Sequence, residues 1–86
     1  MASMASARWV RLPASATTTV RSTSGTLVRV VLLTNGGTVT LRDGSRVLGQ
    51  IALDAPEGTY TFGAYCQTSI IAETGSTVDA LVVFDD

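Results

Sequence analysis

The sequence predicts an all-β protein, an antiparallel β-sandwich or barrel of seven or eight strands. Val, Ile and Thr, whose branched side chains favour pleated strands, make up about 30% of the 86 residues. Gly, Asn and Asp punctuate the chain every 8–12 residues, which is the turn spacing of all-β domains. No segment carries an apolar stripe at helical spacing. The chain is therefore one small domain built of strands.

The N-terminal part predicts a flexible arm over residues 1–16, ahead of a β-sandwich domain over residues 17–86. The first 24 residues are rich in Ser, Ala and Thr and contain no acid, a composition that overlaps with organelle transit peptides. Pro13 and the run Thr17-Thr18-Thr19-Val20 argue against the amphipathic helix of such a peptide. Within the arm, residues 8–12 can form a short first strand that Pro13 ends.

The next segments predict the first strands of the domain. Residues 17–22 form a candidate strand, and Ser24-Gly25 turns the chain. Residues 26–34 (TLVRVVLLT) are the strongest strand, because both of its faces are apolar. One face holds Leu27, Arg29, Val31 and Leu33, and the other holds Val28, Val30 and Leu32. A sandwich covers only one face of a strand, so the second face needs a folded-over segment or another subunit.

Residues 38–53 predict a β-hairpin. Asn35-Gly36-Gly37 turns the chain before it, and Asp43-Gly44 forms the tight turn within it. Gly49 in the middle of the second strand indicates a bulge or a close approach of the backbone. Val39 and Leu41 are expected to face inward from the first strand, and the side chains expected to share one face of the second strand are Val47, Gly49, Ile51 and Leu53.

The remaining segments predict three further strands. Pro and Gly place residues 54–58 in a loop, and residues 59–64 alternate with aromatic side chains on one face. Residues 68–73 form the next strand, and residues 74–76 turn the chain. The last strand, residues 77–84 (TVDALVVF), is again apolar on both faces.

The composition offers no catalytic equipment. The chain has no His and no Lys, which excludes imidazole acid–base chemistry, His–metal sites and Schiff-base chemistry. Cys66, the single cysteine, has no His to activate it and predicts a buried or half-buried thiol rather than a nucleophile. Asp43-Gly44 lacks the alternating oxygen ligands of a calcium-binding loop. Asp54 and Glu57 are more typical of polar residues in a surface loop than of the acid pair of a glycosidase. We predict a protein that is not an enzyme, with no catalytic residues, no cofactor and no metal site.

Charge is divided between the two halves of the chain. Residues 1–42 hold five Arg and no acid, whereas residues 43–86 hold one Arg and seven acids. This division fits chance, and it equally fits a basic N-terminal part that meets an acidic surface on another copy or on a partner. A net charge of -1 gives no reason to expect nucleic acid as a partner. No apolar run approaches the length of a membrane span, so we expect no membrane partner.

The size of the chain predicts a homo-oligomer. A domain of 86 residues has a small core with which to offset the entropy of ordering its chain. A single cysteine forms no internal disulfide. A subunit interface is the remaining stabilising device.

The order of the segments resembles that of a known group of proteins. In strand pattern and turn placement, residues 17–86 are similar to the small all-β virion proteins of tailed bacteriophages, of the capsid decoration or cement type. The segments that carry the resemblance are 25–31, 37–44, 51–54, 58–63 and 77–84. Related chains often place Gly-Leu where this chain has Ser69-Ile70.

The resemblance implies a jelly-roll-like sandwich on the exterior of the virion head, made in the cytoplasm of the bacterial host. Such proteins bridge neighbouring subunits of the major capsid protein, often as trimers or dimers, and we favour the trimer. The resemblance implies no catalytic residues in this chain. The alternatives are another phage structural component, in the tail, neck or fibre base, and a standalone carbohydrate- or ligand-binding module.

The candidate contact residues come from the arm and from the strongest strand. In the arm, Trp9 supplies an apolar anchor between the charges of Arg8 and Arg11, and could instead stack on a base or sugar ring. Deleting residues 1–12 is expected to abolish capsid binding and leave the domain folded. In the strand, the candidate contacts with another subunit are Val28, Val30 and Leu32.

Overall fold

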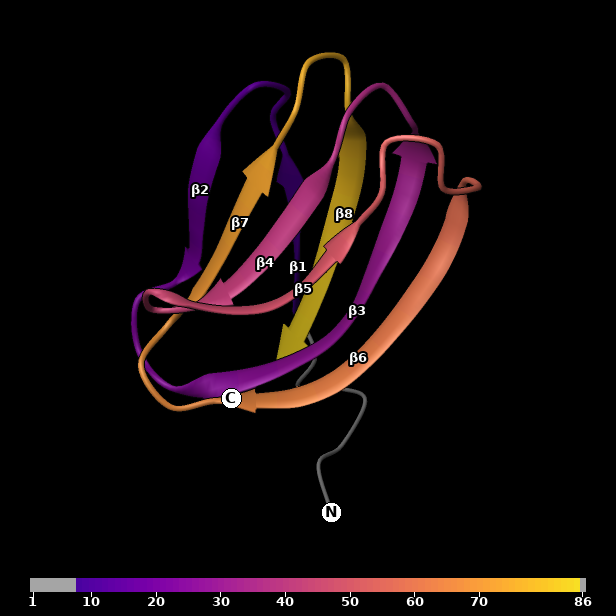
Figure 1. The fold of residues 1–86 in the computed structure, drawn as a ribbon. Helices are drawn as coiled ribbons and strands as arrows, with labels where there is room; N and C mark the ends of the chain where they lie inside the picture. Colours follow the sequence, from indigo (N-terminus) through magenta and orange to yellow (C-terminus); the bar gives the residue numbers. More distant parts are fainter. Residues whose placement is uncertain (1–7, 86) are drawn as a thin grey trace.

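The computed structural model describes residues 8–85 and confirms an all-β protein (Figure 1). This part of the chain contains eight strands and no helix, and so no helix that could cross a membrane. The strands are β1 (Arg8–Leu12), β2 (Thr17–Arg21), β3 (Gly25–Thr34), β4 (Val39–Asp43), β5 (Arg46–Ile51), β6 (Gly58–Cys66), β7 (Ile70–Thr74) and β8 (Asp79–Asp85).

The strands form two four-stranded antiparallel sheets that pack face to face (Figure 1). Sheet A has the order β1-β8-β3-β6, and sheet B has the order β2-β7-β4-β5. The pairs β1–β8, β2–β7, β3–β6 and β4–β5 are nested within one another, as in a single long ribbon folded around the β4–β5 turn. The pairs β3–β8 and β4–β7 close each sheet. This nested order confirms the jelly-roll sandwich.

The core lies between the two sheets and is almost wholly aliphatic. Alternate residues of each strand point into it, as the pleat of a strand requires. Its fully buried side chains include Leu27, Val30 and Leu32 of β3 and Leu41 of β4. The other buried apolar residues are Leu12, Val39, Ile51, Cys66, Ile70, Ala72, Val78, Ala80, Val82 and Phe84.

An irregularity in β3 changes the faces expected for this strand. The register with both neighbouring strands shifts between Leu27 and Arg29. Val28 is an extra residue relative to β8, whereas relative to β6 the extra residue lies in β6. The inward residues are therefore Leu27, Val30 and Leu32, whereas strict alternation from residue 26 to 34 placed Leu27 opposite to the other two. The prediction was wrong because a bulge reverses the facing of every residue after it.

Residues 8–12 belong to the sandwich rather than to a flexible arm. They form β1, which pairs along its whole length with β8, from Arg8 opposite Phe84 to Leu12 opposite Ala80. Val10 and Leu12 point toward the core, and this burial holds the strand in place. The short first strand expected at residues 8–12 is thus confirmed, whereas the flexible arm expected over residues 1–16 is wrong for these residues. Residues 1–7 lie outside the part of the chain described.

The predicted hairpin over residues 38–53 is confirmed as β4 and β5, with Gly44 at positive φ in its turn. A bulge also occurs here, because the register shifts between Leu41 and Arg42. The close approach expected at Gly49 is confirmed, since a Cβ there would lie 3.2 Å from the ring of Phe62. The bulge places Val47 opposite the outward Arg42, 56% exposed, and Leu53 lies beyond the strand and is 63% exposed. The prediction that they share one face with Gly49 and Ile51 was therefore wrong.

The turn at residues 35–37 connects two sheets rather than two strands of a hairpin. It carries the chain from β3 in sheet A to β4 in sheet B, beside the connection from β7 to β8. Gly75 N–H donates to the carbonyl of Thr38 across a 2.8 Å hydrogen bond. A Cβ on Gly37 would lie 2.8 Å from the Cα of Gly75, so the two connections pass each other only because both residues are glycine.

Candidate functional site

The outer faces of the two sheets differ in polarity. The outward side chains of sheet B include Thr17, Thr40, Arg42 and Glu73, which alternate with buried core residues. Arg42 and Glu73 form an ion pair across β4 and β7. This pattern is the usual one for a sheet that faces water on one side.

The outer face of sheet A is apolar at its centre. One row across the sheet runs from Trp9 of β1 through Val83 of β8 to Arg29 of β3. The neighbouring row runs from Arg11 through Leu81 to Val31. Trp9 is 66% exposed, and Val31, Leu81 and Val83 are half-buried. We call these six residues, Trp9, Arg11, Arg29, Val31, Leu81 and Val83, the sheet A face.

Two arginines give the sheet A face its charge. At its border, Arg11 donates from Nε to Oδ1 of Asp79 over 2.9 Å and from a terminal nitrogen to Oδ2 over 2.5 Å. These hydrogen bonds and the opposite charges raise the pKa of Arg11 and lower that of Asp79. Arg29 lies between Val83 and Thr61, and within residues 8–85 no carboxylate forms an ion pair with it. A partner that covers this face therefore needs a negative group or a polar acceptor near Arg29.

Part of the charge difference between the two halves is neutralised by ion pairs within the chain. Arg11 and Arg42 from the first half pair with Asp79 and Glu73 from the second. The nested ribbon brings early strands beside late ones, so these pairs follow from the topology.

The predicted contact residues are divided among three environments. Trp9 and Arg11 lie on the sheet A face, and Arg8 lies at the start of β1, exposed. Val28 is half-buried at the bulge of β3. Val30 and Leu32 are core residues with almost no exposed surface, so they are not available to another subunit.

Four residues of the sheet A face were absent from the predicted contacts: Arg29, Val31, Leu81 and Val83. The signal for Leu81 and Val83 was present in the two-sided apolar pattern of the last strand. Val31 and Arg29 were assigned to the opposite set because the bulge at Val28 is invisible in the sequence.

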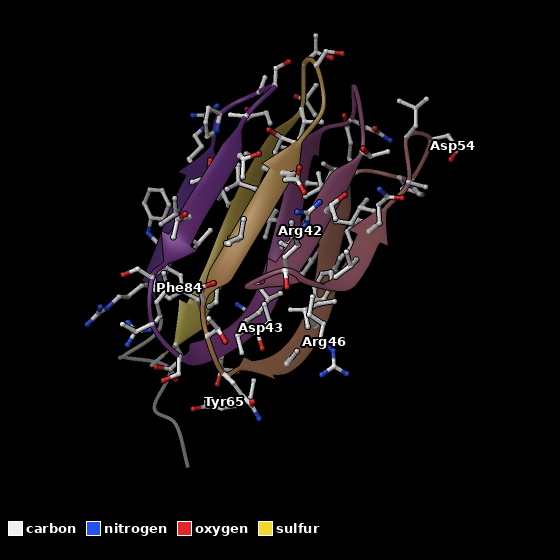
Figure 2. The ribbon with its side chains drawn as sticks, turned by 60° about the vertical axis from the view of Figure 1, so that its left-hand side comes forward. Arg42, Asp43, Arg46, Asp54, Tyr65 and Phe84 are labelled. Atoms are coloured by element: carbon white, nitrogen blue, oxygen red, sulfur yellow. The ribbon has the colours of Figure 1, made fainter. Side chains whose placement is uncertain are left out.

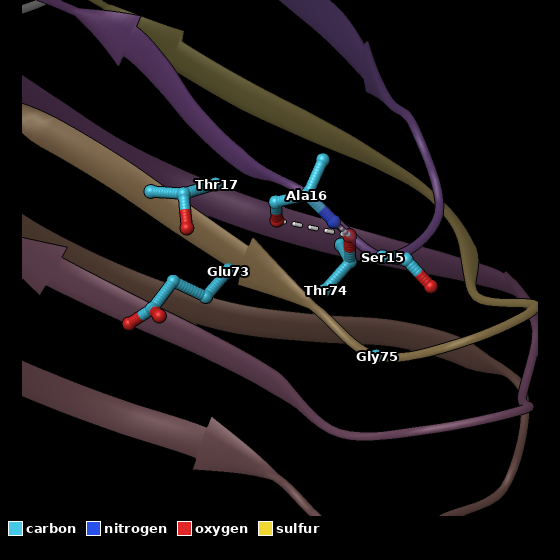
Figure 3. Close-up of a pocket in the computed structure, with 6 residues that line it drawn as sticks. All are labelled: Ser15, Ala16, Thr17, Glu73, Thr74 and Gly75. Carbon is cyan, nitrogen blue, oxygen red and sulfur yellow. Dashed lines mark hydrogen bonds between the residues drawn. The ribbon is translucent and has the colours of Figure 1, made fainter.

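A shallow hollow of about 340 Å³ lies where the β1–β2 loop meets the end of β7 (Figure 3). Its lining groups bind one another. The hydroxyl of Thr74 donates to the carbonyl of Pro13 and accepts the N–H of Ala16. Glu73, the one ionisable group in the lining, pairs with Arg42. The hydrogen bonds of Thr74 thus hold the β1–β2 loop against the end of β7.

Asp43 anchors the β4–β5 turn to the β6–β7 loop. Its carboxylate accepts the backbone N–H groups of Gln67 and Thr68 over 2.9 Å and that of Ser69 over 3.2 Å. These hydrogen bonds hold the pKa of Asp43 below its ordinary value. Figure 2 shows Asp43 at the opposite end of the sandwich from Asp54, so these two acids form no common site.

Cys66 and Glu57 have structural surroundings rather than the surroundings of a reactive site. Cys66 is fully buried, as predicted, and burial together with the charge of Asp43 raises the pKa of its thiol. Glu57 accepts the backbone N–H of Asn35 over 3.3 Å, which ties the β5–β6 loop to the end of β3. Among residues 8–85, no three Asp, Glu or Cys side chains gather closely enough to hold a metal ion.

No protein-family model, curated protein or solved structure matches the chain. The fold and the surface define its class as a small jelly-roll sandwich with one polar and one apolar outer sheet face.

Proposed function

We propose that the protein is a structural virion protein that decorates a tailed-bacteriophage capsid and stabilises it by bridging major capsid protein subunits. The sheet A face is the single observation that supports this function most directly. An adhesive protein needs an open surface rather than a cleft, and the half-buried apolar side chains in its two rows are suited to being covered by a flat partner.

The chemistry of the sheet A face specifies its partner. Trp9 and the aliphatic centre gain free energy when a partner removes them from water. Arg29 lies among these apolar side chains and favours a partner with an acidic or carbonyl oxygen opposite it. We expect the capsid surface to supply an apolar patch with such an oxygen.

Val83 gives the sharpest test of the proposed surface. Val83 lies opposite Arg29 on sheet A, and Ile71 lies opposite Arg42 on sheet B. Both are half-buried and β-branched, and both occupy inner strands. Val83→Glu and Ile71→Glu therefore place the same charge beside an arginine on opposite faces of the molecule, and both substitutions are expected to leave the sandwich folded.

The assay is co-sedimentation with empty head shells purified from the source virus. We expect wild-type protein and Ile71→Glu to sediment with the shells and Val83→Glu to remain in solution. Equal binding by Val83→Glu would overturn the sheet A face as the capsid contact. Gold labelling of the protein on the tail or neck would overturn the capsid role in favour of another virion role, and glycan-array binding without shell binding would favour a carbohydrate-binding module.

We use point variants because deleting residues 1–12 would not be a clean test. The deletion removes β1 as well as Trp9, and it leaves β8 without a neighbour on one side. Loss of binding would then report damage to the sheet as much as loss of a contact.

A further inference from the structure

The two sheets end in four edge strands, β1 and β6 in sheet A and β2 and β5 in sheet B (Figure 1). An edge strand presents unpaired backbone N–H and C=O groups, and soluble proteins protect such edges with charged side chains, proline or short length. Three of these edges follow the rule. β1 contains Arg8 and Arg11, β2 contains Arg21 and β5 contains Arg46, and none of the three exceeds six residues.

β6 departs from the rule in both respects. It is nine residues long, and its sequence, GTYTFGAYC, contains no charged residue and no proline. The outward side chains of Thr59 and Thr61 are exposed and small enough to permit another strand beside them. An open edge of this kind is a template for pairing with an extended chain.

We propose that β6 pairs antiparallel with β6 of a second copy, joining two A sheets into one eight-stranded sheet across a twofold axis. The other three edges are shorter and carry arginines, which disfavour pairing with another strand. β6 is the edge at which a strand can meet its own copy without like charges. A second copy is therefore the occupant that fits it best, and the product is a dimer with one self-complementary interface.

The register that we propose centres on the regular part of β6. Gly58 has a φ of +143°, and Gly63 has a φ of +61° and lies at the point where pairing with β3 shifts, so the extended run between them is residues 59–62. Within this run, a twofold axis at Tyr60 places Thr59 of one copy opposite Thr61 of the other. Paired threonines across antiparallel strands are favourable neighbours.

This interface borders the sheet A face, because Thr59 and Thr61 lie opposite Val31 and Arg29 of β3. Trp9 lies on β1, at the other edge of sheet A. The dimer would place two sheet A faces side by side and so double the surface presented to a shell. It does not rest on the proposed function, and it gives a dimer where the family resemblance favours a trimer.

The test is the solution mass of the full chain by size exclusion with light scattering. We expect wild-type protein to have twice the chain mass of 8.9 kDa. Thr59→Lys/Thr61→Lys should have the mass of one chain. Thr17→Lys/Thr19→Lys is the matched control, since it makes the same two changes at exposed positions of edge strand β2, and it should remain a dimer.

Charge complementation gives a second readout that does not depend on the register. Thr59→Glu/Thr61→Glu should also be a monomer, and an equimolar mixture with the lysine variant should restore the double mass. Circular dichroism checks that each variant is folded. A wild-type monomer at all concentrations, a trimer, or a lysine variant that remains dimeric would each overturn the proposal.

Hydrogen exchange on the wild-type protein keeps the proposal testable if the variants fail to fold. Amides of β6 should lose protection as the protein is diluted, whereas those of edge strand β5 should not change. Protection of β6 that is independent of concentration would overturn the pairing.

Discussion

Replacing Trp9 by alanine should uncouple capsid binding from folding. A tryptophan side chain buries about 150–250 Å² when fully covered, and Trp9 is 66% exposed. A partner can therefore cover about 100–165 Å² of it, which at ~25 cal/mol/Å² contributes about 2.5–4 kcal/mol. The remaining third already contacts the protein and contributes about 1–2 kcal/mol to its stability.

These magnitudes predict a large effect on binding and a small effect on folding. Trp9→Ala should weaken shell binding by about two to three orders of magnitude and lower the free energy of unfolding by about 1–2 kcal/mol. Val47→Ala is the matched control, because Val47 is 56% exposed but lies on the edge of sheet B, and this change should leave binding unaltered.

Trp9 also provides the assay. It is the single tryptophan of the chain, so its emission reports its own environment. Titration of wild-type protein with shells should shift the emission to shorter wavelength as Trp9 leaves water, and co-sedimentation should give the affinities of both variants. An unshifted emission on binding, or equal affinities of wild-type protein and Trp9→Ala, would refute the reasoning.

Three further predictions concern the sandwich itself. Leu41→Ala should lower the free energy of unfolding by about 3–5 kcal/mol in urea melts, because Leu41 is fully buried and leaves a cavity; a loss below 1 kcal/mol would mean that the core collapses around the gap. The pKa of Asp43 is lower in the folded state than in the unfolded state, so its carboxylate stabilises the fold fully above its unfolded pKa of about 3.9, and this contribution is lost as the pH falls through the folded value. Melting temperatures between pH 2 and 6 should therefore fall more steeply for wild-type protein than for Asp43→Asn, and parallel curves would contradict the clamp on the β6–β7 loop. Cys66 is buried and its pKa is raised, so a thiol reagent should label it at once in guanidinium and only slowly in the native protein; immediate labelling of the folded protein would show that β6 opens readily.

The sequence predicted the elements whose signals are local. Asp43-Gly44 between two alternating segments marked the β4–β5 hairpin, and turn residues marked the other strand boundaries to within a few positions. The thiol of Cys66 was correctly expected to be buried because no partner for chemistry exists in the chain.

The sequence could not predict which way side chains face after a bulge. The extra residues at Val28 in β3 and near Leu48 in β5 are set by the strands beside them, and each reverses the pattern that follows. Val30 was therefore assigned to a subunit contact although it is core, and Val47 was placed on the same face as Ile51 although it lies opposite the outward Arg42. The register across β1, β8 and β3, which gathers Trp9 with residues far along the chain, is likewise a property of the fold.

The nested ribbon has a consequence for synthesis of the protein. The turn between β4 and β5 lies at the middle of the ribbon, so pairing can proceed outward from it as the later strands leave the ribosome. β1 is made first, but its only neighbour in sheet A is β8, the last of the eight strands. Until β8 emerges, β1 has no partner and β3 lacks one of its two. Chains that stall before β8 would thus expose apolar strands to one another. We expect such chains to aggregate or to be degraded by proteases.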